Sequence, residues 1–223
     1  MIRLHHCPQT RSMRTLWLLH ELGVPFEVTE WPFDKALRSA EFLALNPVGR
    51  VPALEMDGRS LWETGAITEV LCERFPDAGL GRAPGHAERA DWLIWVHFSE
   101  TISTHAQVLT QQHVMLREDW MRSPVVMKLE AARLGKCFDA VERGLAGDWL
   151  LAGGFSAADV SVAQAVYMAR HFAHIGERPR LQEWYDRCAA REGFRASLPT
   201  AGGALYPREF FEPPEVVPPE GKR

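Results

Sequence analysis

A proline- and glycine-rich stretch at residues 76–85 divides the 223-residue chain into two parts with different hydrophobic patterns. Before this stretch, short strand-like runs alternate with helical runs. After it, apolar residues recur at helical spacing and no strand-like run is evident. We therefore expect two domains, one over residues 1–76 and one over residues 86–206, with their boundary in the proline- and glycine-rich stretch.

The first part predicts the order strand, helix, strand, two further strands and a final helix. Residues 2–5 form a strand-like run, and a helical run follows at residues 11–22. The Gly-Val-Pro sequence at residues 23–25 ends that helix, so the next extended segment should pair parallel with the first strand. Asp57-Gly58 predicts a hairpin turn, and residues 64–75 carry apolar positions at helical spacing.

The second part is predicted to be all-helical. Its helices are expected at residues 87–115, 124–145, 157–172 and 179–191. The tail at residues 207–223 contains two Pro-Pro pairs among charged residues, which argues against regular structure there.

Composition and charge favour a compact protein that acts on small molecules. Hydrophobic residues make up 46% of the chain and charged residues 24%, a balance typical of globular proteins. The net charge of −4 gives no electrostatic attraction to nucleic acid, and no stretch of about 18 apolar residues predicts a membrane helix. The first residues lack the apolar core of a signal peptide, so we expect a cytoplasmic protein.

The cysteines and histidines predict neither disulfides nor a metal site. The four cysteines are widely spaced, so we expect reduced thiols at Cys7, Cys72, Cys137 and Cys188. The histidines show no spacing to cysteine or aspartate that is typical of a metal site. His5 and His6 lie in the first predicted strand, where ordinary packing explains them.

Three local motifs accompany this two-part pattern. Residues 46–54 read Asn-Pro-Val-Gly-Arg-Val-Pro-Ala-Leu and lead into a strand. Residues 63–67, Glu-Thr-Gly-Ala-Ile, begin a helix, and residues 155–160 carry Ser156 and Asp159 at the spacing of a capping box. Taken singly, the motifs also fit local roles as a turn, a helix cap and a capping box. Their order and spacing resemble the cytosolic glutathione transferases.

The resemblance covers nearly the whole chain except the tail, and it implies both a fold and a reaction. The first domain would be thioredoxin-like and bind glutathione as co-substrate, and the all-helical second domain would shape the pocket for a small hydrophobic electrophile. The expected reaction is conjugation of the glutathione thiolate to that electrophile. The resemblance also implies a homodimer and gives no role to a metal.

The resemblance assigns glutathione-binding roles to five residues. In the family the proline at the position of Pro52 is cis, which would let Val51 offer its backbone N–H and C=O to the cysteinyl part of glutathione. Arg50 is expected to meet the glycyl carboxylate. Thr64, at a helix N-terminus, would receive the γ-glutamyl carboxylate, and Glu63 would pair with the ammonium group. The family more often has serine at the position of Thr64.

Conjugation requires a group that raises the thiolate fraction of bound glutathione, because the thiolate is the nucleophile. The loop that follows the first strand should lie near the sulfur. Counting back from Arg14 places Thr10 closest to the hydroxyl of serine-type family members, with Ser12 as the second choice. Thr10 also fits a purely local role as the cap of the first helix.

Cys7 leaves a second chemistry open. Family members with Cys-Pro in this loop form a mixed disulfide with glutathione, and a cysteine beside a helix N-terminus would have a lowered pKa. A Cys7-dependent thiol transferase or disulfide reductase is therefore one alternative. The other interpretation of Cys7 is a buried apolar residue without a chemical role. A non-catalytic glutathione-binding protein of the same fold is another.

One long helix of the second part carries two further expectations. Glu100 is a candidate for the acidic residue that, in the family, approaches the γ-glutamyl amine from the partner subunit. An aromatic and histidine-rich run on the same helix has the spacing of a core stripe, and some of its members are expected to face the cleft between the domains. The run comprises Trp92, Trp95, His97, Phe98 and His105.

Overall fold

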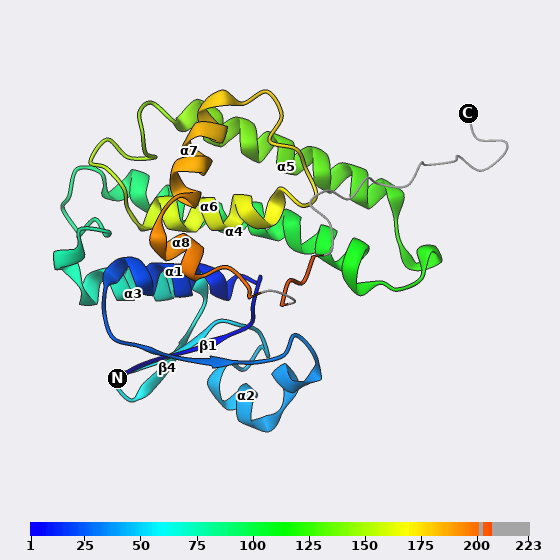
Figure 1. Ribbon diagram of the computed structural model, residues 1–223, viewed down its shortest axis with the longest axis horizontal. Coiled ribbons are helices and arrows are strands. Elements are labelled where there is room, and N and C mark those ends of the chain that lie inside the picture. The colour runs from blue at the N-terminus through cyan, green and yellow to red at the C-terminus, as the bar shows by residue number, and fades with distance from the viewer. Residues whose placement is uncertain (201–202, 207–223) are drawn as a thin grey trace.

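The computed structural model describes residues 1–200 and 203–206, and its elements fall into two groups (Figure 1). The first group is β1 (Ile2–His6), α1 (Ser12–Leu22), β2 (Glu27–Glu30), η1 (Lys35–Arg38), α2 (Ala40–Leu45), β3 (Ala53–Met56), β4 (Arg59–Trp62), α3 (Thr64–Arg74) and η2 (Pro76–Ala78). The second group is α4 (Arg89–Thr110), η3 (Gln111–Met115), η4 (Asp119–Met121), α5 (Pro124–Gly144), α6 (Ala157–Ala169), α7 (Pro179–Ala189) and α8 (Glu192–Ala196). The tail predicted for residues 207–223 lies outside the described residues.

The first group forms a four-stranded mixed sheet in the order β2-β1-β3-β4. β1 pairs parallel with β2 and antiparallel with β3, so Leu4 lies opposite both Val28 and Leu54. Helices α1 and α3 lie between the sheet and the helices of the second group, and α2 lies on the other side of the sheet (Figure 1). This arrangement is the predicted thioredoxin-like domain followed by a helical one. The expected fold class is therefore confirmed.

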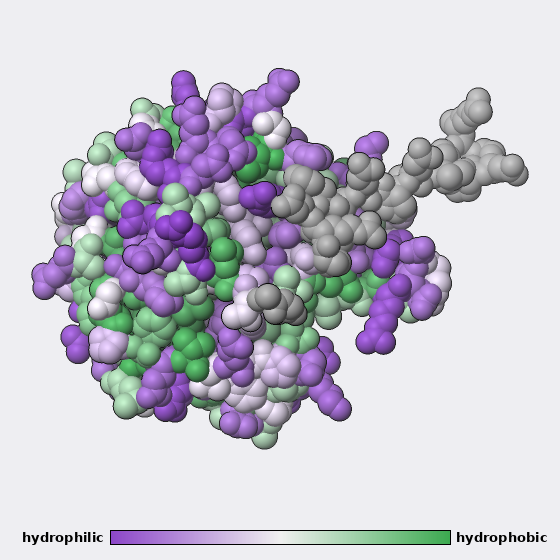
Figure 2. Space-filling view, viewed as in Figure 1, coloured by the Kyte–Doolittle hydropathy of each residue, from purple (hydrophilic) through white to green (hydrophobic). Residues whose placement is uncertain are grey.

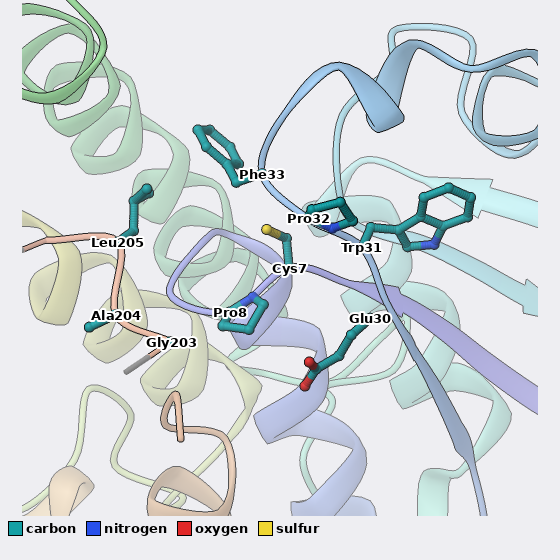
Figure 3. A pocket seen from close by; sticks show the side chains of 9 residues that line it. All are labelled: Cys7, Pro8, Glu30, Trp31, Pro32, Phe33, Gly203, Ala204 and Leu205. Carbon is teal, nitrogen blue, oxygen red and sulfur yellow. The ribbon is translucent and has the colours of Figure 1, made fainter. Parts of the chain in front are cut away.

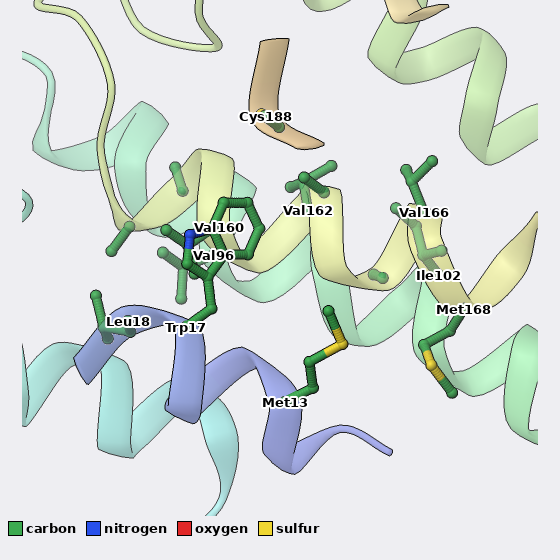
Figure 4. Close-up of a cluster of buried hydrophobic side chains, with 14 of the residues drawn as sticks. Met13, Trp17, Leu18, Val96, Ile102, Val160, Val162, Val166, Met168 and Cys188 are labelled. Atoms are coloured by element: carbon green, nitrogen blue, oxygen red, sulfur yellow. The ribbon is translucent and has the colours of Figure 1, made fainter. Parts of the chain in front are cut away.

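A continuous apolar core joins the two groups. Met13 and Trp17 point from α1 toward α6 (Figure 4), and the ring of Trp17 packs edge-on against Phe194 of α8 at 5.0 Å between centroids. Both residues of α1 are fully buried. Helix α1 is therefore covered by the sheet on one side and by the second group on the other, which fixes the loop before it relative to both.

The long helices agree with the hydrophobic spacing to within a few residues, and the short elements do not. The helix expected at residues 87–115 ends as α4 at Thr110 and continues as one π-helical turn. The short helix α8 was not predicted, because five residues are too few to show a period. The domain boundary stays a prediction, in a region where the structure has only the short turn η2 after α3.

The capping box predicted at the start of α6 is confirmed. The Ser156 side chain accepts from the Ala158 N–H at 3.2 Å, and Asp159 accepts from the Ser156 N–H at 2.9 Å. Asp159 also accepts from the Leu150 N–H and from the indole N–H of Trp184. This buried carboxylate thus ties the α6 terminus to α7 and to the preceding loop.

The surface is mainly polar on the face shown in Figure 2, with apolar side chains interspersed. Within residues 1–200 and 203–206, no helix is long and apolar enough to cross a membrane.

Candidate functional site

Two buried hydroxyl groups meet in the loop between β1 and α1. Thr10 Oγ1 lies 2.8 Å from Ser12 Oγ and donates to the carbonyl of Cys7 at 2.8 Å. Ser12 Oγ accepts from the Cys7 N–H at 3.1 Å. Thr10 also accepts from the Ser12 N–H at 3.3 Å, so part of its role is the local one expected at a helix start. The structure therefore brings both candidate hydroxyls to one point.

His6 extends this pair of hydroxyls into the sheet. Its Nδ1 lies 2.8 Å from Ser12 Oγ, and burial lowers the pKa of His6 to about 4. The ring is therefore neutral at physiological pH. The expectation of ordinary packing for His6 overlooked this contact, because the sequence alone does not show that the end of β1 faces the loop.

Cys7 has a raised pKa, opposite in direction to the lowered value on which the disulfide alternative depended. Burial raises the pKa of the Cys7 thiol to about 11, and the carboxylates of Glu30 and Asp34 add to this effect. The side chain is only 2% exposed. A thiol in this environment is protonated at neutral pH and is a poor nucleophile.

The segment before β3 has the backbone conformation that the resemblance implied. The Val51–Pro52 peptide bond is cis. The side-chain amide of Asn46 donates to the Arg50 carbonyl at 2.5 Å and lies 3.4 Å from the Pro52 carbonyl, which holds the segment in place. Gly49 has φ +67°, and a Cβ there would lie 2.8 Å from the carbonyl oxygen of Leu37, so the turn requires glycine.

Glu63 and Thr64 stand at the N-terminus of α3 in different environments. Glu63 is exposed and has a left-handed φ of +73°, which is uncommon for a non-glycine residue. Thr64 is buried, and its hydroxyl donates to Glu100 Oε1 of α4 at 2.5 Å. The hydroxyl expected to be free for a ligand carboxylate is thus engaged by Glu100.

Glu100 is the centre of a partly buried ion-pair network between the two domains. The fully buried guanidinium of Arg14 contacts Glu100 Oε1 and donates to Ser103 at 3.1 Å, and Arg11 binds Glu100 Oε2 at 3.1 Å. Burial alone would raise the pKa of Glu100. Arg14, the Thr64 hydroxyl and Arg11 together overcome that effect and hold it at about 2. The carboxylate is therefore ionised at neutral pH.

A second contact point brings Arg50 into the same cluster. Arg50 and Arg11 both donate to Gln107 Oε1, at 3.3 Å and 3.1 Å. Arg14 and Arg11 bind Glu100, and Arg50 joins them through the shared Gln107 oxygen. Three guanidinium groups and one carboxylate leave this cluster positively charged and suited to an anionic ligand. Sequence analysis missed Arg11 and Gln107 as partners, because they are 96 positions apart and belong to no local motif.

An open pocket of about 440 Å³ lies beside the β1–α1 loop (Figure 3). The thiol of Cys7 points into it, while the indole of Trp31 points away (Figure 3). The walls come from the β1–α1 loop, from the segment after β2 and from the last described residues of the chain. They are Cys7, Pro8, Glu30, Trp31, Pro32, Phe33, Gly203, Ala204 and Leu205.

Gln9 holds the segment at residues 203–206, which forms one wall of this pocket. It has φ +52° and is 3% exposed, and its Oε1 accepts from the Tyr206 N–H at 3.0 Å. Its amide nitrogen donates to the hydroxyl of Tyr167 at 3.0 Å. From α6, Gln164 donates to the Thr10 carbonyl at 3.2 Å. The conformation of the loop thus depends on partners in the second domain.

The aromatic run on α4 does not line the pocket. Trp92 is core and donates to the Leu80 carbonyl at 3.1 Å, and Trp95 packs edge-on against Phe98. His97 pairs with Glu69 at 3.2 Å. The face of α4 toward the site carries Glu100, Ser103 and Gln107 instead. The remaining member, His105, lies 2.6 Å from Glu130 of α5.

Among the described residues, no group of three or more histidine, cysteine or acidic side chains is arranged to hold a metal ion.

Comparison with known proteins identifies the family. Residues 1–72 match the model of the glutathione S-transferase N-terminal domain, and residues 110–187 match that of the C-terminal domain. Glutathione S-transferase F13 of Arabidopsis thaliana is 30% identical over 193 residues, covering 81% of this chain and 87% of its own. The chain belongs to the glutathione S-transferase family. The predicted family and enzyme class are thereby confirmed.

Bacterial transferases are also similar to this one. GstB of Escherichia coli K12 is 27% identical over 202 residues, covering 83% of this chain and 91% of its own. The theta class glutathione S-transferase from Xanthomonas axonopodis pv. citri, solved with glutathione bound, superimposes with a TM-score of 0.79 at 25% identity, covering 92% of this chain and 99% of that one.

Proposed function

We propose that this transferase conjugates glutathione to a small hydrophobic electrophile, and that the Thr10 hydroxyl donates a hydrogen bond to the glutathione thiolate. The observation that carries the proposal is the position of this buried hydroxyl, in a loop that borders both the cationic cluster and the open pocket. A hydrogen bond from a hydroxyl to a thiolate favours the anion and so lowers the pKa of the bound thiol.

We assign glutathione to the segment before β3 and the start of α3. Val51, before the cis Pro52, would pair its backbone with the cysteinyl part, and Arg50 would bind the glycyl carboxylate. Because the Thr64 hydroxyl already donates to Glu100, the γ-glutamyl carboxylate would be received by the first-turn N–H groups of α3. The exposed Glu63 would then pair with the ammonium group.

The electrophile would occupy the pocket beside Cys7, where Pro8, Pro32, Phe33 and Leu205 provide apolar contacts. The raised pKa of Cys7 argues against a reaction through a protein thiol. The domains we assign are residues 1–76 and 86–206. We further propose a cytoplasmic homodimer, for which sedimentation should give about twice the 25.2 kDa mass of the chain.

The thiol assignment is tested by titrating the thiolate absorbance of bound glutathione. Thr10→Ala should raise the pKa of the bound thiol by about one unit, which corresponds to about 1.4 kcal/mol of lost preference for the anion. It should also slow conjugation of an aryl halide at pH 6.5 by roughly tenfold. Cys7→Ser should leave the pKa of the bound thiol unchanged. The opposite pattern, with a mixed disulfide in the wild-type protein, would refute the proposal.

The Arg50 assignment has a separate test. Arg50→Ala should raise the KM for glutathione by roughly tenfold with little change in kcat, because the lost ion pair contributes to binding rather than to the reacting sulfur. Arg195→Ala, on the exposed face of α8, is the matched control for removing an arginine. An equal KM in both variants would exclude Arg50 from glutathione binding.

A further inference from the structure

His6, Ser12 and Thr10 form a row of three buried polar side chains that ends at the proposed position of the sulfur. Ser12 Oγ stands between the other two, 2.8 Å from His6 Nδ1 and 2.8 Å from Thr10 Oγ1. All three side chains are less than 10% exposed. Little solvent competes for their hydrogen bonds, so the hydrogen of each group is directed by its protein neighbours.

Ser12 has one hydrogen to donate and two lone pairs to accept with, and the Cys7 N–H occupies one of these pairs. The other pair faces either His6 or Thr10. If His6 Nδ1 lacks a hydrogen, Ser12 donates to His6 and its free lone pair attracts the hydrogen of Thr10. In that arrangement Ser12 competes with the sulfur for the hydrogen of the Thr10 hydroxyl.

The reverse arrangement removes that competition. If His6 Nδ1 carries the hydrogen, it donates to Ser12 and fills the second lone pair. Ser12 can then only donate, either to Thr10 or to the Cys7 carbonyl, which lies 3.1 Å away. Thr10 no longer has an acceptor in Ser12, so its hydrogen is available to the thiolate.

The surroundings of the ring favour this second tautomer. Burial keeps the imidazole neutral, so one of its two nitrogens carries a hydrogen. Within residues 1–200 and 203–206, Ser12 is the side chain that hydrogen-bonds to this ring, and it does so at Nδ1. A hydrogen placed on Nδ1 has an acceptor, whereas a hydrogen on Nε2 would have none among these residues.

We propose that His6 and Ser12 are positioning residues that direct the Thr10 hydroxyl toward the glutathione sulfur. His6 Nδ1–H donates to Ser12, Ser12 donates to Thr10, and Thr10 donates to the thiolate. No proton is transferred between these groups. The Thr10 hydroxyl only rotates, so that its hydrogen points to the sulfur instead of to the Cys7 carbonyl. Each bond polarises the next and strengthens it. This inference rests on the proposed role of Thr10.

Mutation of the two positioning residues tests this row of hydrogen bonds, which we call the relay. Ser12→Ala and His6→Leu should each raise the pKa of bound glutathione by roughly half a unit and lower kcat at pH 6.5 about threefold. The dissociation constant for glutathione should change less than about twofold, since the relay acts on ionisation rather than on binding. His6→Asn keeps an N–H donor near the position of Nδ1 and should restore most of the loss. His20→Asn, at the exposed end of α1, is the control for the substitution itself.

A double-mutant cycle separates the relay from the proposed function. In the Thr10→Ala protein, adding His6→Leu should cause no further change in the pKa of the bound thiol, because the relay has lost its last member. Additive effects would overturn the relay while leaving the role of Thr10 intact. If Thr10→Ala alone has no effect, the proposed function itself fails.

A spectroscopic measurement needs no active variant. Nitrogen-15 NMR of histidine-labelled wild-type protein, with the His6 signals assigned from His6→Asn, should show the hydrogen on Nδ1 in the presence of glutathione. A hydrogen on Nε2 would overturn the relay, whatever the variants do.

Discussion

Thr64, at the first position of α3, donates its hydroxyl hydrogen to Glu100 of α4 over 2.5 Å. Because the fully buried Arg14 of α1 binds the same carboxylate oxygen, three helices from two domains meet at one ion pair. The cationic cluster around Glu100 therefore contributes to the packing of the two domains as well as to the candidate functional site.

Glu100→Gln should destabilise the protein by about 3 kcal/mol, because it leaves the fully buried guanidinium of Arg14 without an opposite charge. Urea denaturation would measure the loss. Glu73→Gln is the matched control, since Glu73 is more than half exposed and lies 3.8 Å from Arg89; it should cost less than about 1 kcal/mol. Equal losses of stability in the two variants would show that the Glu100 network stabilises the protein no more than an exposed ion pair does.

The same carboxylate should shape acid stability. The pKa of Glu100 is about 2 in the folded protein, below its ordinary value of 4.5. The stabilisation is therefore complete above about pH 4.5 and is lost as the pH falls toward 2. Glu100→Gln should weaken the pH dependence of stability in this window. A curve parallel to that of the wild type would contradict the assignment.

The thiols should react slowly in the folded protein. All four cysteines are buried, and burial raises the pKa of Cys7 to about 11 and that of Cys72 to about 12. With a thiol reagent at pH 7, native protein should react at least a hundredfold more slowly than an exposed cysteine. Unfolded protein should titrate four thiols. One rapidly reacting thiol at Cys7 would contradict this picture.

Tyr206 should control how the pocket holds the electrophile. Its ring lies 4.7 Å from that of His171, its hydroxyl lies 2.9 Å from Thr110, and its N–H binds Gln9. Tyr206→Ala should raise the KM for the electrophile about threefold or more, because the wall containing Leu205 loses its anchor. The KM for glutathione should stay within about twofold. Tyr206→Phe, which loses only the hydroxyl, should have a smaller effect.

Asp159→Ala should be the more costly of two changes in the capping box. Asp159 is fully buried and accepts from Ser156, Leu150 and Trp184, so its loss leaves several buried donors unpaired and should cost about 3 kcal/mol or more. Ser156→Ala should cost only about 1 kcal/mol. Thermal unfolding of both variants would measure the difference. Similar losses of stability would show that Asp159 acts only as a helix cap.

The sequence was sufficient for features that depend on local periodicity and local chemistry. The long helices follow from apolar spacing, and the capping box of α6 follows from Ser156 and Asp159 being three residues apart. The cis bond at Pro52 followed from a family resemblance in a short motif. These features are encoded within about ten residues of chain.

The features that the sequence did not reveal depend on distant packing. The pKa of Cys7 moves upward because the folded chain buries the thiol near Glu30 and Asp34. The α4 stripe does not reach the pocket, because Trp92 packs in the core and His97 pairs with Glu69. Glu100 and Gln107 lie toward the site instead. Periodicity gives the apolar face of a helix, but not the partner that each face will meet.

Gln164 and Tyr206 belong to the second domain, yet they hold the loop that carries Thr10 through its backbone and through Gln9. The conformation of the loop in the first domain therefore depends on the second domain. A chimera that joins this first domain to the helices of another family member would retain the Thr10 hydroxyl and lose the contacts that hold its loop. Under the proposed function, a substitution at residues 203–206 that changes the preference for the electrophile would also change the activation of the glutathione thiol.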